Sequence, residues 1–488
     1  MRRSLRALAL GVCAGLAACA PQPGPGAAPV APGTPRAAPA VFTLPELPAD
    51  ARPGLLLLVS IAGLPPHAYR AGAGEPPWMP NLAALAAAGA AADGLVPVAG
   101  AASASAHATL ITGRTPAVHG VGADHPLGPR GVEAEHQRRA EGIAAPALWS
   151  AARAAGIAVA SLGWPSSAGA PVDWLFPELF PARPGESSPG ILEGEATPLL
   201  LASARRLGAE EPEAGFPGPA RDAILTSLAC ELVAGPTPPR LLLLRLSQSE
   251  PVLRLDGPDS EPARRAFASA DAELGRLLGC LEGAGRLAES AWFVTGDAAV
   301  LPVHTQIQPN VALEAAGLLV PSPGSRSGIG RWDALARSNG VSAFVYARDA
   351  ETAILARRAL GEAAARSHAF RVVPAQELLA LGVDREAWFG LEAEPGFAFG
   401  DTLRGGLLLV PSTAKGAAGS LGRAPERRVG FVAWGRGIRS ALRIPELGQT
   451  DVAPTLAYLL GVELPEGEGR PLVGALGVLP PAVGAGAR

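Results

Sequence analysis

A few side chains that could do chemistry follow short apolar runs of this chain. Ser103 lies in "ASASAH", Glu250 and Arg254 lie in "EPVLRLDGPDS", and Asp297 lies in "TGDAAV". A hydroxyl group becomes a nucleophile when a base or a metal ion activates it, and carboxylates can hold such a metal ion. The run "LLLLVSIAGL", in contrast, ends at Ala62, whose methyl group can do neither. These positions raise the question of whether a catalytic site has been lost.

The elements that must position these residues alternate along the chain. Short apolar runs bounded by Gly or Pro predict strands, and they begin at residues 55, 157, 240, 291, 341, 406 and 429. Helical patterns lie between them, over residues 79–92, 146–156, 261–285 and 450–461. Strands that alternate with helices indicate a mostly parallel sheet covered on both faces. The fold class predicted is therefore α/β, doubly wound, and ligands should gather at the carboxyl ends of its strands.

Two stretches interrupt this alternation. Residues 168–218 are rich in Pro, Gly and Glu and predict a cap segment or a long loop. Residues 325–400 have a strand-helix-strand pattern of their own and predict a small lobe. We therefore expect one α/β domain over residues 51–475, with these two insertions, followed by a flexible tail over residues 476–488.

The N-terminus has the pattern of an export signal. "MRRSLRALALGVCAGLAAC" combines a basic start, an apolar run too short to span a membrane, and small residues. It ends in "LAAC", which resembles the bacterial lipobox, and this resemblance implies a lipidated Cys19 as the mature N-terminus. An ordinary signal peptide with an incidental cysteine is the alternative. We predict a lipoprotein signal peptide over residues 1–19 and a Pro/Ala/Gly-rich tether over residues 20–50. Because Ala20 is not acidic, the resemblance favours an anchor in the outer membrane of the cell envelope.

Composition argues against nucleic acid as a partner and leaves open whether two of the cysteines form a disulfide. The net charge is −3, and no Lys/Arg cluster extends beyond short pairs, which argues against binding to nucleic acid. Of the four cysteines, Cys13 lies in the signal and Cys19 would carry lipid, so that Cys230 and Cys280 remain. In an exported protein these two could form a disulfide. Two buried thiols are the alternative, since each lies in a helical apolar pattern.

Several stretches of the chain resemble one family, in order along the sequence. "HATLITGRTPAVHGVGAD" over residues 107–124 and "WFVTGDAAVLPVHTQIQPNVALEAAGLL" over residues 292–319 are similar to the type I phosphodiesterase/nucleotide pyrophosphatase family of the alkaline phosphatase superfamily. Further matches extend from residue 54 to about residue 475. The resemblance implies an alkaline-phosphatase-like fold, two zinc ions held by Asp and His, and a Thr or Ser nucleophile. Zinc would activate that nucleophile and stabilise charge on the attacking and leaving oxygens.

At the family's functional positions this chain carries unexpected residues. The nucleophile position falls on Ser103. The six ligand positions fall on Ala62, Glu250, Arg254, Asp297, Ala298 and Ala418. Only Asp297 is of the expected type, Glu250 is a conservative change, and the other four side chains cannot bind zinc. The resemblance therefore implies that the two-zinc site is lost, that no cofactor is expected, and that these seven residues line one cleft.

The remaining donors do not replace the missing ligands. The histidines of the chain are His67, His107, His119, His125, His136, His304 and His368, and none falls at a ligand position. We expect His107 and His119 to stabilise loops, whereas His304, seven residues after Asp297, could reach the edge of the cleft. No Ser-His-Asp spacing surrounds Ser103, which we expect to be the N-cap of the helix that follows it.

The function we expect is that of a pseudoenzyme, an envelope lipoprotein that acts by binding. Its expected partners are the membrane, through lipid at Cys19, and an anionic small molecule or an envelope protein. One alternative is an active phosphodiester or phosphomonoester hydrolase with unrecognised metal ligands, and another is a metal-free lyase or hydrolase that uses Ser103 and Asp297. For Arg254 we expect a guanidinium that pairs with Glu250 and Asp297 in place of zinc, the alternative being a side chain that points to solvent.

Overall fold

The main element of the fold is an eight-stranded sheet. The computed structural model describes residues 52–70, 75–124, 137–178, 188–208, 218–322, 329–403, 406–465 and 467–477. They lie in one compact unit, Glu46–Arg488. The strand order is β19 (Leu442–Ile444), β2 (Ala90–Ala92), β18 (Phe431–Gly435), β7 (Ser290–Gly296), β1 (Leu55–Ile61), β6 (Leu241–Leu246), β4 (Val159–Leu162) and β5 (Trp174–Phe176). All pairings within this sheet are parallel except those of β18, which runs antiparallel to β7 and β2.

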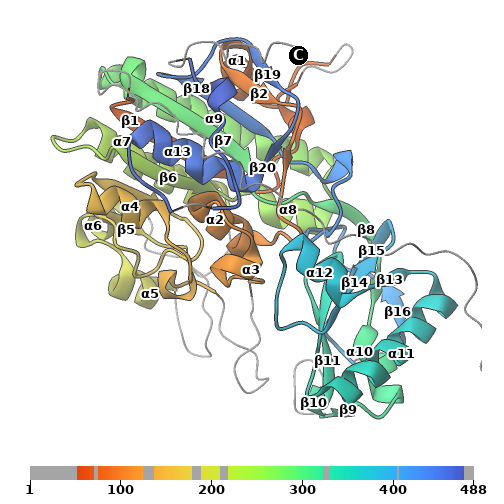
Figure 1. Cartoon of the computed structure of the whole chain (residues 1–488). Coiled ribbons are helices and arrows are strands. Elements are labelled where there is room, and N and C mark those ends of the chain that lie inside the picture. Colours follow the sequence, from red (N-terminus) through yellow and green to blue (C-terminus); the bar gives the residue numbers. More distant parts are fainter. Residues whose placement is uncertain are drawn as a thin grey trace, which may run out of the picture. The chain divides into compact units, whose positions relative to one another are not determined.

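Helices cover both faces of this sheet (Figure 1). On one face pack α1 (Pro80–Ala88), α7 (Pro219–Ala234) and α9 (Glu261–Gly283), and on the other pack α2 (Ser103–Thr112), α4 (Leu148–Ala154) and α13 (Val452–Leu460). Along β1, Leu55 and Leu57 contact the first group of helices, while Leu56 and Leu58 contact the second. A strand buried on both faces is apolar at every position, which is why its sequence shows no alternation. The predicted α/β class is confirmed.

Smaller sheets and helices complete the described part of the chain. An antiparallel sheet has the order β11 (Ala334–Ser338), β12 (Ser342–Ala347), β14 (Phe389–Ala393) and β13 (Phe370–Val373), and α11 (Ala350–Ser367) packs against it. Strand β8 (Leu301–Ile307) pairs with β15 (Gly396–Phe399), β16 (Leu409–Pro411) and β17 (Gly416–Ala417). The remaining strands are β3 (Leu95–Val96), β9 (Leu319–Pro321), β10 (Ile329–Trp332) and β20 (Leu447–Gly448). The remaining α-helices are α3 (Pro116–His119), α5 (Ser188–Glu195), α6 (Pro198–Arg206), α8 (Ser249–Asp256), α10 (Pro309–Ala315) and α12 (Ala375–Leu381).

The helix expected over residues 79–92 is shorter than its sequence pattern indicates. Helix α1 ends at Ala88, and the last alanines of the pattern form β2 at the sheet edge. Gly89 lies between them, where an added Cβ would come 2.2 Å from the carbonyl oxygen of Ala433 in β18. Only glycine allows this approach of two backbones, so the chain can leave the helix and join the sheet.

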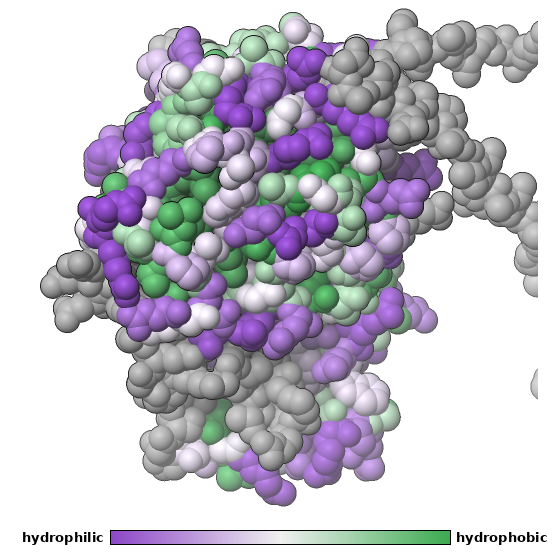
Figure 2. Space-filling view, turned by 90° about the vertical axis from the view of Figure 1, so that its left-hand side faces the viewer, coloured by the Kyte–Doolittle hydropathy of each residue, from purple (hydrophilic) through white to green (hydrophobic). Residues whose placement is uncertain are grey.

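The two cysteines outside the signal form a disulfide, which joins Cys230 of α7 to Cys280 of α9. This settles the choice between a disulfide and two buried thiols. On the face drawn in Figure 2, hydrophilic side chains surround small groups of hydrophobic ones. Among the described helices, none is both long enough and apolar enough to cross a membrane. Cys19, the tether over residues 20–50 and the last eleven residues of the predicted tail lie outside the described residues.

Candidate functional site

The seven residues expected at the inherited site line one cavity of about 400 Å³. They come from different elements at the carboxyl edge of the sheet and beside it: Ala62 follows β1, Ser103 begins α2, Glu250 and Arg254 lie on α8, Asp297 and Ala298 follow β7, and Ala418 follows β17. This is the convergence expected from the sequence, because parallel strands end at a common edge.

Asp297 is fixed by the backbone around it. Its Oδ1 accepts hydrogen bonds from the N–H groups of Gly63 at 2.8 Å and Ala298 at 2.7 Å. The side-chain amide of Gln449 donates to the carbonyl oxygen of Asp297 at 2.8 Å. The side chain of Asp297 is 7% exposed, and only its Oδ2 faces the centre of the site. This oxygen faces the guanidinium of Arg245.

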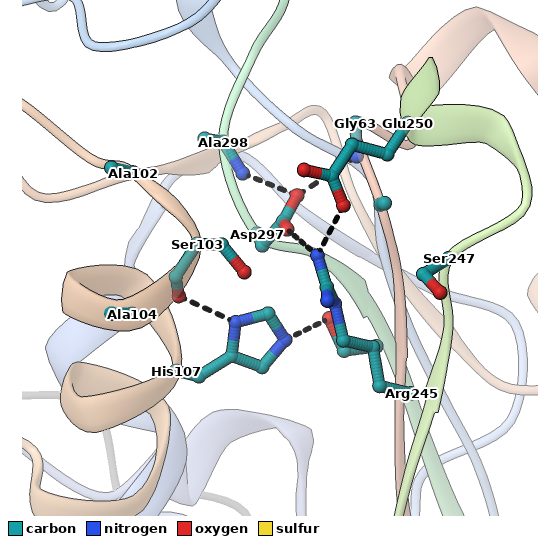
Figure 3. Close-up of polar contacts among 12 residues, drawn as sticks. Gly63, Ala102, Ser103, Ala104, His107, Arg245, Ser247, Glu250, Asp297 and Ala298 are labelled. Atoms are coloured by element: carbon teal, nitrogen blue, oxygen red, sulfur yellow. Dashed lines mark hydrogen bonds and ion pairs between the residues drawn. The ribbon is translucent and has the colours of Figure 1, made fainter. Parts of the chain in front are cut away.

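Arg245, the fifth residue of β6, places its guanidinium among the carboxylates of the site (Figure 3). Its Nη2 donates to Glu250 Oε2 at 2.7 Å and lies 3.8 Å from Asp297 Oδ2. Its Nη1 contacts Glu178, which follows β5. The side chains of Arg245 and Glu178 are 1% and 2% exposed. The carboxylates of Glu250 and Asp297 therefore face a guanidinium, as the sequence led us to expect, but it belongs to Arg245 and not to Arg254.

The sheet explains how a charged side chain reaches this position. In the strand register, Ser60 of β1 is paired with Arg245 of β6 and with Thr295 of β7, so that all three lie on the same face. The turn after β6 is fixed by Asp222 of α7, whose carboxylate accepts the N–H groups of Ser247 and Gln248, both at 3.0 Å. Ser60, Arg245 and Thr295 thus form a polar row across the sheet, one residue before the carboxyl ends of β1, β6 and β7.

Burial and charge shift the pKa values of this group in opposite directions. Burial lowers the pKa of Arg245, but the carboxylates of Glu178, Glu250 and Asp297 outweigh this effect and raise it above its ordinary value. Burial raises the pKa of Glu178 to about 7, although Arg245 opposes the rise. Partial burial also raises the pKa of Glu250, with Arg245 opposing this rise and the nearby charge of Asp297 adding to it. Arg245 therefore favours the ionised forms of Glu178 and Glu250, against the effect of burial.

Arg254 does not have the role expected for it. The sequence prediction paired its guanidinium with Glu250 and Asp297, but the side chain is exposed on α8 and forms no ion pair within the described part of the chain. Helix α8 begins at Ser249, so Glu250 lies in its first turn and Arg254 one turn later, at the rim of the cavity. The cation that neutralises the carboxylates is Arg245, and the prediction for Arg254 was wrong.

The alanines at the positions where the family resemblance implied ligands are in apolar or buried surroundings. Ala298 is buried in a cluster with Val98, Ala101 and Ala106, and Ala418 packs against this cluster. Ala62 is 2% exposed, and its carbonyl oxygen accepts a hydrogen bond from Ser249 at 2.6 Å. Methyl groups therefore occupy these positions, and burial of apolar surface stabilises this packing.

Ser103 is not the N-cap of α2. The N-cap is Ala102, whose N–H donates to Ser105 Oγ at 2.9 Å, and the N–H of Ala104 donates to Asp124 Oδ1 at 2.6 Å. The sequence prediction was wrong because the serine that bonds the N-cap backbone is Ser105, in the first turn of the helix, and the N-cap itself is an alanine, which has no capping side chain. The Oγ of Ser103 is buried and has no hydrogen-bond partner within the described residues. It points toward Asp297 and Arg245 in Figure 3.

His107 is held too firmly to serve as a base for Ser103. Its Nδ1 lies 2.7 Å from the carbonyl oxygen of Ser103, and its Nε2 lies 2.8 Å from Ser60 Oγ. A carbonyl oxygen only accepts, so Nδ1 carries the proton and Nε2 accepts from the serine. Burial, together with the charge of Arg245, holds the pKa of His107 well below its ordinary value. The ring is therefore neutral and links α2 to the polar row of the sheet.

The other described histidines lie away from the centre of the site. His119 is buried beside Thr109 Oγ1 at 3.0 Å, and burial lowers its pKa to about 4. His304 does not line the cleft and instead packs edge-on against Phe397. His67 contacts Trp78, and His368 ends α11. His125 and His136 lie outside the described residues.

The residues present do not fit two zinc ions. Of the six family positions, only Glu250 and Asp297 carry oxygen donors, and both face Arg245. Within the described ranges, no group of three or more His, Cys, Asp or Glu side chains is arranged to hold a metal ion. Structural and catalytic zinc sites use three or four protein ligands. No step of a metal-dependent reaction can therefore be derived from these side chains.

Three residues of the site were missed by sequence reasoning. Asp124 ends a stretch that carries the family resemblance, and Glu178 lies in the Pro/Gly-rich segment, so neither position suggested a role in the site. Arg245 gave the clearest signal, since it is a lone charge in the apolar run "LLLLRL". An arginine buried in such a strand must be paired, although its partner cannot be named from the run itself.

The fold and the site at the strand ends define an alkaline-phosphatase-like α/β protein. The sequence model of the type I phosphodiesterase/nucleotide pyrophosphatase family matches residues 56–378, and the chain belongs to this family. Human ectonucleotide pyrophosphatase/phosphodiesterase 5 is similar in structure, with a TM-score of 0.65, 16% identity, and coverage of 87% of this chain and 100% of that chain. An inactive variant of the murine protein in complex with AMP gives a TM-score of 0.64, 17% identity, and coverage of 86% and 99%. At these identities the likeness is one of fold. No curated protein matches the chain.

Proposed function

We propose that this chain is a non-hydrolytic member of its family, a pseudoenzyme that retains the phosphodiesterase fold for binding. The observation that carries the proposal is the position of Arg245, whose guanidinium lies among Glu178, Glu250 and Asp297. In a two-zinc enzyme the metal ions supply the positive charge that stabilises the attacking and leaving oxygens. Here that charge belongs to a side chain already engaged with three carboxylates.

The surroundings of Arg245 support the same proposal. Ala298 and Ala418 belong to an apolar cluster, so restoring a histidine at either position would place a polar ring against methyl groups. The neighbouring His107 is neutral and hydrogen-bonded on both nitrogens, and so it is not available to take a proton from Ser103. Loss of a single group that contacts the reacting atoms commonly lowers a rate by several orders of magnitude.

Our proposal places the protein in the cell envelope, as a lipoprotein of the outer membrane anchored through Cys19. The lipobox-like "LAAC" is its basis in the sequence. The disulfide between Cys230 and Cys280 supports export, because such bonds persist in oxidising compartments such as the bacterial periplasm. Metabolic labelling with a clickable palmitate tests the anchor: the natural chain should take up the label, and a Cys19→Ala variant should not. Equal labelling of the natural chain and the Cys19→Ala variant would show that Cys19 does not carry the lipid.

A small anionic molecule is the ligand class that we propose for the cleft. Arg245 partly offsets the charge of Glu250 and Asp297, and Arg254 extends an exposed guanidinium at the rim of the same cavity. A guanidinium recognises carboxylate and phosphate groups through two parallel hydrogen bonds. AMP is a suitable probe, because the murine relative of similar fold has been solved in complex with it.

The proposal is tested by metal content and turnover of the purified protein. Protein refolded or grown in the presence of zinc is desalted, its zinc is measured by mass spectrometry, and hydrolysis of bis(p-nitrophenyl) phosphate and p-nitrophenyl phosphate is followed. We expect zinc well below one equivalent and no hydrolysis above that of a boiled control. Zinc near two equivalents together with turnover would establish the alternative, an active hydrolase with other metal ligands.

A further inference from the structure

A single atom of Arg245 has the surroundings of a bound cation. Its Nη2 lies 2.7 Å from a carboxylate oxygen of Glu250 and 3.8 Å from one of Asp297. The other terminal nitrogen contacts the carboxylate of Glu178. These three carboxylates come from α8, from the residue after β7 and from the segment after β5. Among the described residues, the guanidinium of Arg245 is the group that joins them.

Other charged groups near this position do not balance the three carboxylates. Arg221 of α7 acts on Glu178 and Glu250, and Asp124 adds a fourth negative charge near Glu250. His107 contributes no charge because it is neutral. Arg254 lies exposed at the rim, where water screens its charge. Arg245 is therefore the buried cation shared by Glu178, Glu250 and Asp297.

We propose that Arg245 is a resident cation, which supplies the positive charge of this site from within the chain and excludes a free cation from it. The inference rests on the proposed function, since a metal-loaded site would leave no place for the guanidinium. Breaking a buried ion pair leaves an uncompensated charge, and a diffusible cation of suitable shape can then compensate it. Removal of the Arg245 side chain should thus turn the site into a receptor for a small cation.

The test compares the thermal unfolding of four proteins with and without methylguanidinium chloride. They are the natural chain, Arg245→Ala, Arg245→Lys and Arg254→Ala, each at millimolar methylguanidinium and at matched sodium chloride. Methylguanidinium has the shape and charge that the Ala variant lacks. Arg254→Ala is the matched control, because it removes a guanidinium from the rim of the same cavity and leaves the buried one in place. Arg245→Lys retains a charge at the buried position.

We expect the Tm of Arg245→Ala to rise by about 2 °C or more with methylguanidinium, as binding to the folded state alone requires. The natural chain, Arg245→Lys and Arg254→Ala should not respond. If Arg245→Ala does not accumulate as folded protein, its refolding yield from urea is measured with and without methylguanidinium, and a higher yield with the cation is expected.

Two results would overturn the inference: no response of Arg245→Ala in either measurement, or an equal response of the natural chain or of Arg254→Ala. A response of Arg245→Lys as large as that of the Ala variant would also overturn it, since a resident charge should exclude the free one. The zinc content of the natural chain is measured on the same sample. Two equivalents of zinc would refute the proposed function, whereas a zinc-free protein without cation rescue would refute only the resident cation.

Discussion

Replacement of Arg245 by methionine should strongly destabilise the protein. The side chain is 1% exposed and is shared by Glu178, which is 2% exposed, and by Glu250 and Asp297. Methionine fills most of the volume but leaves carboxylates buried without a cation. Removing one partner of a buried ion pair costs about 3–5 kcal/mol, because the other charge remains uncompensated. Urea unfolding followed by tryptophan fluorescence measures the change as a lower midpoint.

A double-mutant cycle assigns this loss to the ion pair. Glu178→Gln removes the most deeply buried of the negative partners, and in that background the same Arg245→Met change should cost less. We expect a coupling of about 1–3 kcal/mol between the two positions. The matched control is Arg254→Met, which lies on the exposed side of α8 and should change stability by less than about 0.5 kcal/mol. Equal stability of the two methionine variants, or a coupling near zero, would refute the electrostatic reasoning.

Four further predictions follow from the same geometry. Ala298→His should give no phosphodiester turnover and a lower Tm, because the imidazole enters an apolar cluster; turnover above the natural chain contradicts this. Burial raises the pKa of Glu178 to about 7 from 4.5, so its contribution to the free energy of unfolding is fully present below pH 4.5 and is lost as the pH rises through 7. In urea unfolding, Glu178→Gln should therefore show a smaller fall in the free energy of unfolding between pH 4.5 and pH 7. The same fall in the variant and in the natural chain would exclude Glu178 as its source. Replacing Cys230 and Cys280 by serine removes a disulfide between residues 50 positions apart, and it should lower the free energy of unfolding in urea by about 4 kcal/mol. Unaltered stability would show that the disulfide does not form in the natural chain. Arg254→Ala should weaken AMP binding about tenfold, as measured by calorimetry. Equal affinity of the variant and the natural chain would show that Arg254 does not bind the ligand.

The strands could be predicted from the sequence because both faces of the sheet are buried. Continuous apolar runs such as the one that forms β1 are typical of strands between two helical layers, and the structure places β1 at Leu55–Ile61. The boundary between α1 and β2 could not be found in the same way. Alanine runs on both sides of Gly89 suit a helix and a small edge strand equally, and only the contact with Ala433 in β18 decides between them.

The position of the site could also be predicted from the sequence, whereas the arginine that pairs with its carboxylates could not. The resemblance aligned Ala62, Asp297 and Ala298 with strand ends, and these residues line one cavity. Arg254 is the arginine among the aligned ligand positions, and it was therefore the cation predicted from the sequence. Arg245 lies five residues before Glu250 and 67 residues from Glu178, so the group exists only after β5 and β6 have entered the same sheet.

A crystal structure of the natural chain grown with zinc tests directly whether Arg245, and not zinc, supplies the positive charge of the cleft. Diffraction is measured above and below the zinc absorption edge. We expect the Arg245 guanidinium between Glu178, Glu250 and Asp297, and no anomalous peak within bonding distance of Asp297. Zinc peaks in that cleft, with the Arg245 side chain turned away from the carboxylates, would contradict it.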